Sequence, residues 1–160
     1  MKKIMFMLAL MLSIALLTTS CDDDDSSTGP NDLKIGTMKA TVAGSSFEAQ
    51  NALYYNINGQ VSGLQTDISD PINGTTKNIS LVLQKTTDVE AKTYAAVCFY
   101  QETIGVGGTG TGKSWNDNSG SCEVTEVTDT EIRGTFTFTG FNDIDSTSKD
   151  VTGSFNVQRQ

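Results

Sequence analysis

Residues 107–114 carry the spacing that phosphate-binding loops use. From Gly107 to Ser114 they read Gly-Gly-Thr-Gly-Thr-Gly-Lys-Ser, which matches the pattern G-x-x-x-x-G-K-[ST]. That pattern binds phosphates through the backbone amides of a loop that joins a buried strand to a helix. Here residues 115–120 read Trp-Asn-Asp-Asn-Ser-Gly, a composition that does not favour a helix. We therefore expect a flexible hairpin tip and no nucleotide binding.

Two of the three cysteines, Cys98 and Cys122, could form a disulfide. Both lie 12 residues from position 110, so a hairpin folded there would place them opposite each other. An oxidising compartment would permit the bridge, and closing this loop would stabilise the fold by roughly 3–4 kcal/mol in the chain-entropy model. The alternative is two separate thiols, with one buried in a strand. A catalytic thiol is not expected, because the chain has no histidine to activate it.

Acidic side chains offer weaker signals. Residues 143–150 alternate oxygen donors but lack the Gly and Glu that an EF-hand calcium loop needs at its sixth and twelfth positions. A plain turn is the favoured interpretation, and no metal or cofactor is expected. The triplet Asp145-Ser146-Thr147 resembles a short O-glycosylation motif of exported Bacteroidota proteins. A pair of carboxylates could hydrolyse glycosides, but nothing in the sequence pairs two of them.

Trp115 is the one tryptophan, and we expect it in a polar loop at 113–120. A tryptophan in a loop can stack on a sugar or anchor a protein partner, which makes it a possible ligand contact. The other interpretation, which we favour slightly, is that its ring folds back onto the sheet.

Cys21 ends an N-terminal segment with the anatomy of a signal peptide. Lys2 and Lys3 precede an apolar stretch at 4–17, and small residues fill 18–20. The junction resembles a lipobox, although Thr18 replaces the usual leucine, so cleavage before Cys21 and lipidation of its thiol are expected. The following run of four aspartates, at 22–25, resembles the surface-export signal of Bacteroidota lipoproteins. We predict a signal peptide at 1–20 and an anchor in the outer membrane. Exposure on the cell surface is favoured over the alternative, an anchor that faces the periplasm.

Composition narrows the partners of the remaining chain. The net charge is −8, and it becomes −10 once Lys2 and Lys3 are removed, so nucleic-acid binding is not expected. Residues 21–32 are predicted to be an acidic, flexible tether. Residues 33–160 suffice for a single domain.

Apolar residues in this domain alternate with polar ones, a period typical of half-buried strands. Ile132, Gly134, Phe136 and Phe138 share one face of such a strand. We predict eight to nine antiparallel strands that form a β-sandwich or a flattened β-barrel. Their expected ranges are 34–42, 46–50, 52–57, 60–67, 77–84, 93–101, 121–127, 131–139 and 149–158.

The strand-and-turn segments at 134–140 and 151–157, the segment 38–47, and Cys21 resemble a family of small Bacteroidota lipoproteins of unknown function. The resemblance implies an all-β domain and transfers no functional residue. The favoured function is a non-catalytic surface binding or adhesion module that recognises glycan or protein through loops such as 105–120. One alternative is a lipocalin-like barrel that carries a small apolar ligand, and a second is a carboxylate-based hydrolase.

Overall fold

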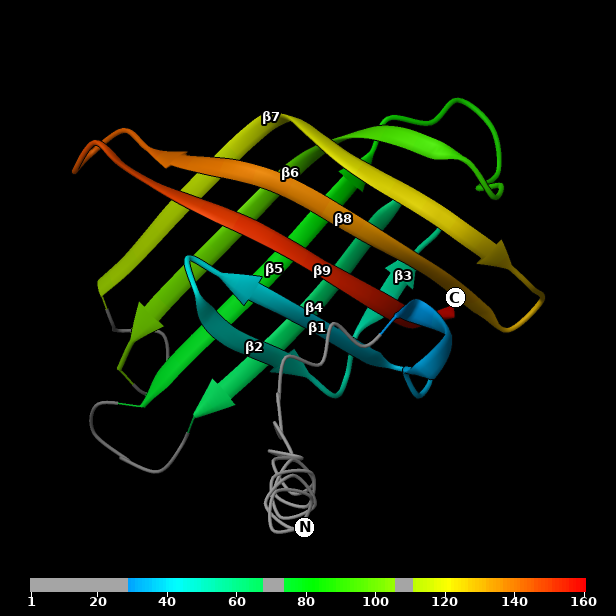
Figure 1. Ribbon diagram of the computed structural model, residues 1–160, viewed down its shortest axis with the longest axis horizontal. Coiled ribbons are helices and arrows are strands. Elements are labelled where there is room, and N and C mark those ends of the chain that lie inside the picture. The colour runs from blue at the N-terminus through cyan, green and yellow to red at the C-terminus, as the bar shows by residue number, and fades with distance from the viewer. Residues whose placement is uncertain (1–28, 68–73, 106–110) are drawn as a thin grey trace, which may run out of the picture.

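The computed structural model describes residues 29–67, 74–105 and 111–160 (Figure 1). These residues form nine strands and one turn of 3-10 helix, η1 (Pro30–Asp32). The strands are β1 (Thr37–Val42), β2 (Ser45–Ala49), β3 (Leu53–Tyr55), β4 (Gln60–Asp67), β5 (Thr75–Leu83), β6 (Thr93–Ile104), β7 (Thr111–Val127), β8 (Glu131–Asn142) and β9 (Thr147–Arg159).

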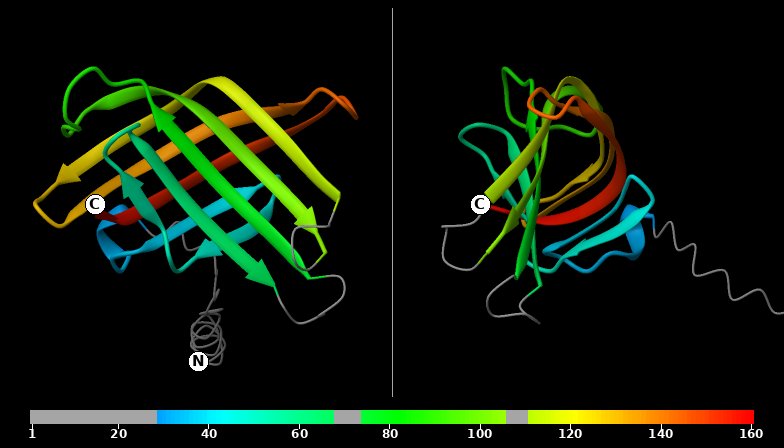
Figure 2. Two further views of the ribbon diagram at one scale, coloured as in Figure 1. Left: turned by 180° about the vertical axis from the view of Figure 1, so that it is seen from behind. Right: turned by 90° about the vertical axis from the view of Figure 1, so that its left-hand side faces the viewer.

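Seven of the strands, β3 to β9, close into a barrel. Antiparallel hairpins link β3 to β9 in sequence order, and a short parallel contact between β3 and β9 completes the ring. The barrel is flattened. Strands β8 and β9 form one of its broad faces and β4, β5 and β6 form the other, and the strands of the two faces cross obliquely (Figures 1 and 2). The all-β prediction is confirmed, and of the two predicted architectures the chain adopts the barrel.

The hairpin β1–β2 extends the sheet beyond β9 and packs over β4. Strand β1 pairs with β9 along residues 37–42, where β3 does not reach. Ala43 and Gly44 make the two-residue turn with φ angles of +47° and +82°, the left-handed pair that such hairpins require. The tip of this hairpin therefore reaches the left-hand end of the barrel in Figure 1, away from η1 and the C-terminus.

Inward-facing apolar residues fill the barrel, as the alternation in the sequence predicts. Large side chains from several strands are less than 2 % exposed, among them Tyr54, Tyr100, Phe47, Phe155 and Met38. At about 25 cal/mol per Å² of buried apolar surface, such residues supply most of the driving force for folding. The part of the chain that the structure describes contains no helix long and apolar enough to cross a membrane.

The main departure from the expected strands is β7, which begins at Thr111 rather than near residue 121. Its polar first half pairs with β6 from Thr111 to Asp117. Between Asn116 and Ser121 the register with β8 shifts, and the Asp117 carboxylate accepts a hydrogen bond of 3.1 Å from the backbone N–H of Thr139 there. A side chain thus replaces a missing ladder bond, which lets a polar segment continue as a strand.

Candidate functional site

The left-hand end of the barrel in Figure 1, where β4 and β6 end and β5 and β7 begin, is here called the mouth. A row of polar residues crosses these four strands near the mouth. Gln65, Lys77, Glu102 and Lys113 are direct neighbours on β4, β5, β6 and β7. Each continues the inward-facing register of its strand by one step past the apolar core. Glu102 therefore has a lysine opposite it on both adjacent strands.

Glu102 is the centre of a hydrogen-bonded cluster. The Tyr100 hydroxyl donates to Glu102 Oε1 at 2.5 Å, and Lys149 Nζ from β9 donates to the same oxygen at 3.1 Å. The Glu102 and Lys149 side chains are 27 % and 23 % exposed, so this ion pair is partly shielded from water. Partial shielding strengthens the attraction relative to that of a fully exposed pair.

Two aromatic rings hold Lys149 in place. Its ammonium lies 4.4 Å from the centre of the Trp115 ring and 5.3 Å from that of Tyr100, and the two ring centres are 5.6 Å apart. The Trp115 indole N–H donates to Thr147 Oγ1 at 2.9 Å. Cation–π contacts of this kind contribute about 0.5–1 kcal/mol each at exposed sites and more where water is excluded.

Burial and charge act oppositely on the Glu102 carboxyl. Burial is the largest single influence and would raise its pKa, but the hydrogen bonds from Tyr100 and Lys149 and the charges of Lys149 and Lys77 together lower it. Glu102 is therefore ionised at neutral pH. Burial, and next the hydrogen bond to Glu102, raise the pKa of the Tyr100 hydroxyl, which stays protonated and acts as a donor.

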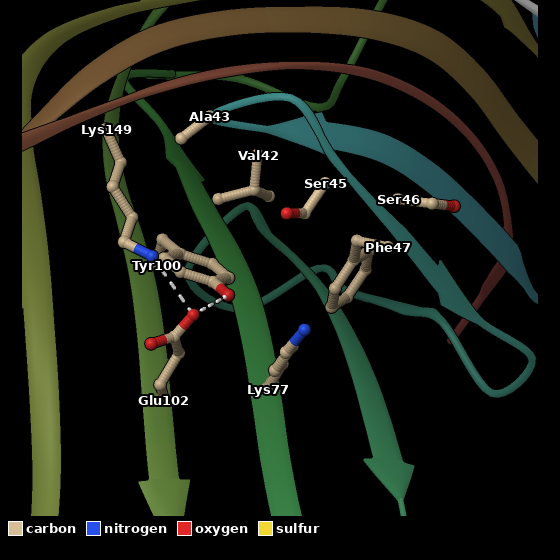
Figure 3. Close-up of a pocket in the computed structure, with 9 residues that line it drawn as sticks. All are labelled: Val42, Ala43, Ser45, Ser46, Phe47, Lys77, Tyr100, Glu102 and Lys149. Carbon is tan, nitrogen blue, oxygen red and sulfur yellow. Dashed lines mark hydrogen bonds and ion pairs between the residues drawn. The ribbon is translucent and has the colours of Figure 1, made fainter. Parts of the chain in front are cut away.

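Between this cluster and the tip of the β1–β2 hairpin lies a cavity of about 130 Å³, shown in Figure 3. One side is charged, with Lys77, Glu102 and Lys149, and the other is formed by the hairpin. The Lys77 ammonium points toward the space between Tyr100 and Phe47 (Figure 3). We call this the mouth pocket, and its lining residues are Val42, Ala43, Ser45, Ser46, Phe47, Lys77, Tyr100, Glu102 and Lys149.

The predicted Cys98–Cys122 disulfide is wrong, because both cysteines are buried free thiols. The β6–β7 register is centred on residues 107–108 rather than 110, which places Cys98 opposite Asp117. Cys122 is paired with Tyr94, four residues from Cys98 on β6. At about 3.3 Å per residue, that displacement exceeds the ~7 Å Cα separation that a bridge tolerates. Burial raises the pKa of each thiol to about 12, so both are protonated and unreactive.

The predicted loop position of Trp115 is also wrong. Trp115 lies within β7, and its ring is only 3 % exposed. The alternative interpretation, a ring folded onto the sheet, describes the structure. Trp115 therefore offers no exposed face for a sugar, and its place is beneath Lys149, next to the mouth pocket.

The remaining sequence motifs fall in turns, in strands or outside the described residues. Lys113 and Ser114, the last residues of the phosphate-loop pattern, lie on β7 rather than at the start of a helix, and 107–110 lie outside the described part. Asp145, in the β8–β9 turn, forms a 2.7 Å ion pair with Lys113 and accepts a hydrogen bond from Thr147. Cys21 and residues 1–28 are also outside the described ranges. No group of three metal-ligating side chains occurs within those ranges.

The charged residues of the mouth pocket were not selected by the sequence patterns, although a signal for them exists. Lys77 lies two residues before Ile79, Glu102 two after Tyr100, and Lys149 two before Val151. Each is the polar end of an inward-facing row. An alternating row that ends in a charge on three different strands indicates a polar barrel mouth.

No protein-family model, characterised protein or solved structure matches this chain. The resemblance to small Bacteroidota lipoproteins therefore stays a prediction. A barrel fold alone hosts many functions, so the function must be inferred from the geometry of the mouth pocket.

Proposed function

We propose that this protein is a non-catalytic binding module, held at the cell surface by a lipid on Cys21, that takes a small polar molecule into the mouth pocket. The ligand is either free or the terminal group of a larger glycan or protein. The observation that carries the proposal is a preformed cavity of about 130 Å³ into which the Lys77 ammonium points. Binding sites are typically concave, with a few fixed polar groups that orient the ligand.

Rigidity of the pocket supports a binding role. Lys149 is held by Glu102 and by two aromatic rings, and Glu102 is held by the Tyr100 hydroxyl as well. These groups do not need to be ordered when a ligand arrives. A site that is ordered in advance loses less conformational entropy on binding, which favours affinity for a small ligand.

The chemistry of the pocket favours binding over hydrolysis. A glycosidase of the usual kind needs two carboxyl groups, about 5–9.5 Å apart, with the acid kept protonated by a raised pKa. Glu102 is the single carboxylate among the lining residues, and its pKa is lowered. The carrier alternative is less well supported, because large side chains such as Tyr54 and Phe155 occupy the barrel interior.

A thermal-shift screen on a pocket-filling variant tests the proposal. Ser45 and Ser46 both line the pocket, but the Ser45 hydroxyl points into it and the Ser46 hydroxyl away from it (Figure 3). Ser45→Leu therefore fills the cavity, and Ser46→Leu is the matched control. A panel of small anions, cations, neutral sugars and apolar molecules is tested against all three proteins. A ligand at 100 times its Kd adds about 2.7 kcal/mol of apparent stability.

We expect at least one ligand to stabilise the wild type and Ser46→Leu but not Ser45→Leu. A ligand that stabilises all three proteins equally binds elsewhere, and that result would overturn the assignment of the pocket. Stabilisation by none of the panel would equally count against it.

A further inference from the structure

We infer that the mouth pocket recognises a small carboxylate with a short apolar tail, an inference that rests on the proposed binding function. Three features of the pocket lead to this chemical class: an unbalanced cation, an apolar wall opposite it, and a volume that admits few atoms.

Charge is the first feature. The charged side chains that line the pocket are two lysines and one glutamate. Lys149 is paired with Glu102 at 3.1 Å, whereas no hydrogen bond or ion pair within the described residues engages the Lys77 ammonium. The field of Lys77 reaches Glu102, but the carboxylate is already bonded to Lys149 and Tyr100. Among the described residues, one positive charge is therefore left over at the pocket, in a chain whose net charge is −8.

The neighbouring charges do not cancel this surplus. Lys113, next along the row from Glu102, forms its own pair with Asp145 at 2.7 Å and does not line the pocket. Gln65, opposite Lys77 on β4, is neutral. A single negative charge on a ligand would therefore neutralise the pocket. Partial shielding from water makes that compensation stronger than on the open surface.

The apolar wall and the volume define the rest of the ligand. Val42, Ala43 and Phe47 form the apolar part of the side that faces the lysines; Val42 and Phe47 are 4 % and 1 % exposed, whereas Ala43 is exposed, so a tail would contact mainly Ala43. An apolar cavity of about 150 Å³ holds benzene, so 130 Å³ admits a ligand of about six non-hydrogen atoms. A carboxylate on a chain of two or three further carbons meets both requirements.

These features also suggest a binding pose. The carboxylate accepts hydrogen bonds from Lys77 Nζ and from the Ser45 hydroxyl, both of which point into the cavity (Figure 3). The tail then extends toward the hairpin side of the cavity, where Val42 and Ala43 lie (Figure 3). The Lys149–Glu102 pair is left intact and serves as the charged floor of the pocket.

Calorimetric titration of the purified full-length protein tests the inference, with butyrate as the probe. Butyramide is its neutral counterpart of equal size, butylamine is a cationic one, and inorganic phosphate is an anion without a tail. We expect saturable butyrate binding with a Kd of about 1 mM or below, well within the affinity that six atoms can supply. Butyramide, butylamine and phosphate should each bind at least tenfold more weakly.

Two lysine variants separate the pocket from general charge effects. Lys77→Gln should weaken butyrate binding at least tenfold, whereas Lys92→Gln changes the net charge equally, does not alter a lining residue and should leave the Kd unchanged. Equal losses in both variants, or none in Lys77→Gln, would overturn the inference.

The remaining outcomes distinguish the ligand class from the function beneath it. Butyramide or butylamine binding as tightly as butyrate, and lost in Ser45→Leu, would leave the pocket as a binding site and refute the anion. Phosphate binding as tightly as butyrate would refute the apolar tail. If none of the four probes binds, the inference fails, and if no ligand of any charge stabilises the protein in the thermal-shift screen, the proposed function fails with it.

Discussion

Replacing Lys149 by methionine removes the charge that joins three residues of the mouth cluster while keeping most of the apolar stem. The variant loses the hydrogen-bonded ion pair to Glu102 at 3.1 Å and the cation–π contact to Trp115 at 4.4 Å. A partly shielded, charge-assisted hydrogen bond contributes about 1–2 kcal/mol and the aromatic contact about 1 kcal/mol. We therefore expect the free energy of unfolding to fall by about 2–3 kcal/mol.

Urea denaturation followed by tryptophan fluorescence measures this change directly. Trp115 is the chain's only tryptophan and lies beneath Lys149, so the signal reports on the site itself. A double-mutant cycle of Lys149→Met with Glu102→Gln isolates the ion pair, and we expect a coupling energy of about 1 kcal/mol or more.

Lys92→Met is the matched control for this experiment. Lys92 also pairs with a glutamate, at 3.3 Å, and lies 5.1 Å from the Tyr94 ring centre, but the two side chains of its ion pair are 50 % and 67 % exposed. Exposed pairs contribute little, so we expect a loss below about 0.5 kcal/mol. Equal losses at the two lysines, or a coupling energy near zero between Lys149 and Glu102, would refute the reasoning that shielding makes the mouth cluster strong.

Four further predictions follow from the structure and the sequence. Cys98 and Cys122 should resist a thiol reagent in the native protein and react only after unfolding in urea; rapid native labelling, or no free thiol after unfolding, would contradict their buried, unbridged state. Folding lowers the pKa of Glu102, so the contribution of this carboxylate to stability is present above its ordinary pKa of about 4.3 and is lost as the pH falls through the lowered value. Urea midpoints should therefore fall from about pH 5 downward, and they should fall less steeply in Glu102→Gln. Identical slopes in the two proteins would be evidence against the network. Gly140→Ala should destabilise the fold by about 1–3 kcal/mol in urea titrations, because the added Cβ would lie 2.8 Å from the tryptophan Cβ, and an unchanged midpoint would refute that close contact. Cys21→Ser should move the protein from the detergent phase to the aqueous phase in a detergent-partition assay, whereas an unchanged distribution would rule out lipidation there.

The strands were predictable because a strand with one buried face has apolar and polar residues in alternation. The row Ile132, Gly134, Phe136 and Phe138 faces the core of β8 as its pattern indicates, and these residues pair with β9 in one continuous register. The closure of the sheet into a barrel has no comparable signal in the sequence. It depends on a two-residue parallel contact between β3 and β9, and one buried face per strand is equally compatible with a sandwich.

The two errors about residues have a common origin in β7. Its first half contains a single large apolar residue, Trp115, so no alternation indicated a strand there. The hairpin tip was then placed too late in the sequence, which brought Cys98 and Cys122 opposite each other. The fold tolerates the polar strand because β7 pairs with β6 along this half, and because the Asp117 carboxylate accepts a hydrogen bond from the Thr139 N–H where the register with β8 shifts.

The mouth pocket was not predictable residue by residue, because it joins strands that are distant in sequence. Lys77 and Glu102 are neighbours across one hairpin, but Lys149 comes from β9, 47 residues beyond Glu102. The wall opposite them comes from the first hairpin of the domain. Patterns within single strands indicate that a polar end exists, and only the closed barrel brings the three charges around one cavity.

Nuclear magnetic resonance titration tests the central claim, ligand binding in the mouth pocket, most directly. Amide spectra of the isotopically labelled protein are recorded as butyrate is added. Saturable shifts should concentrate at residues 42–47 and around Lys77, Glu102 and Lys149, and they should vanish in Ser45→Leu. Shifts that fail to saturate, or that concentrate on other parts of the barrel, would contradict the account.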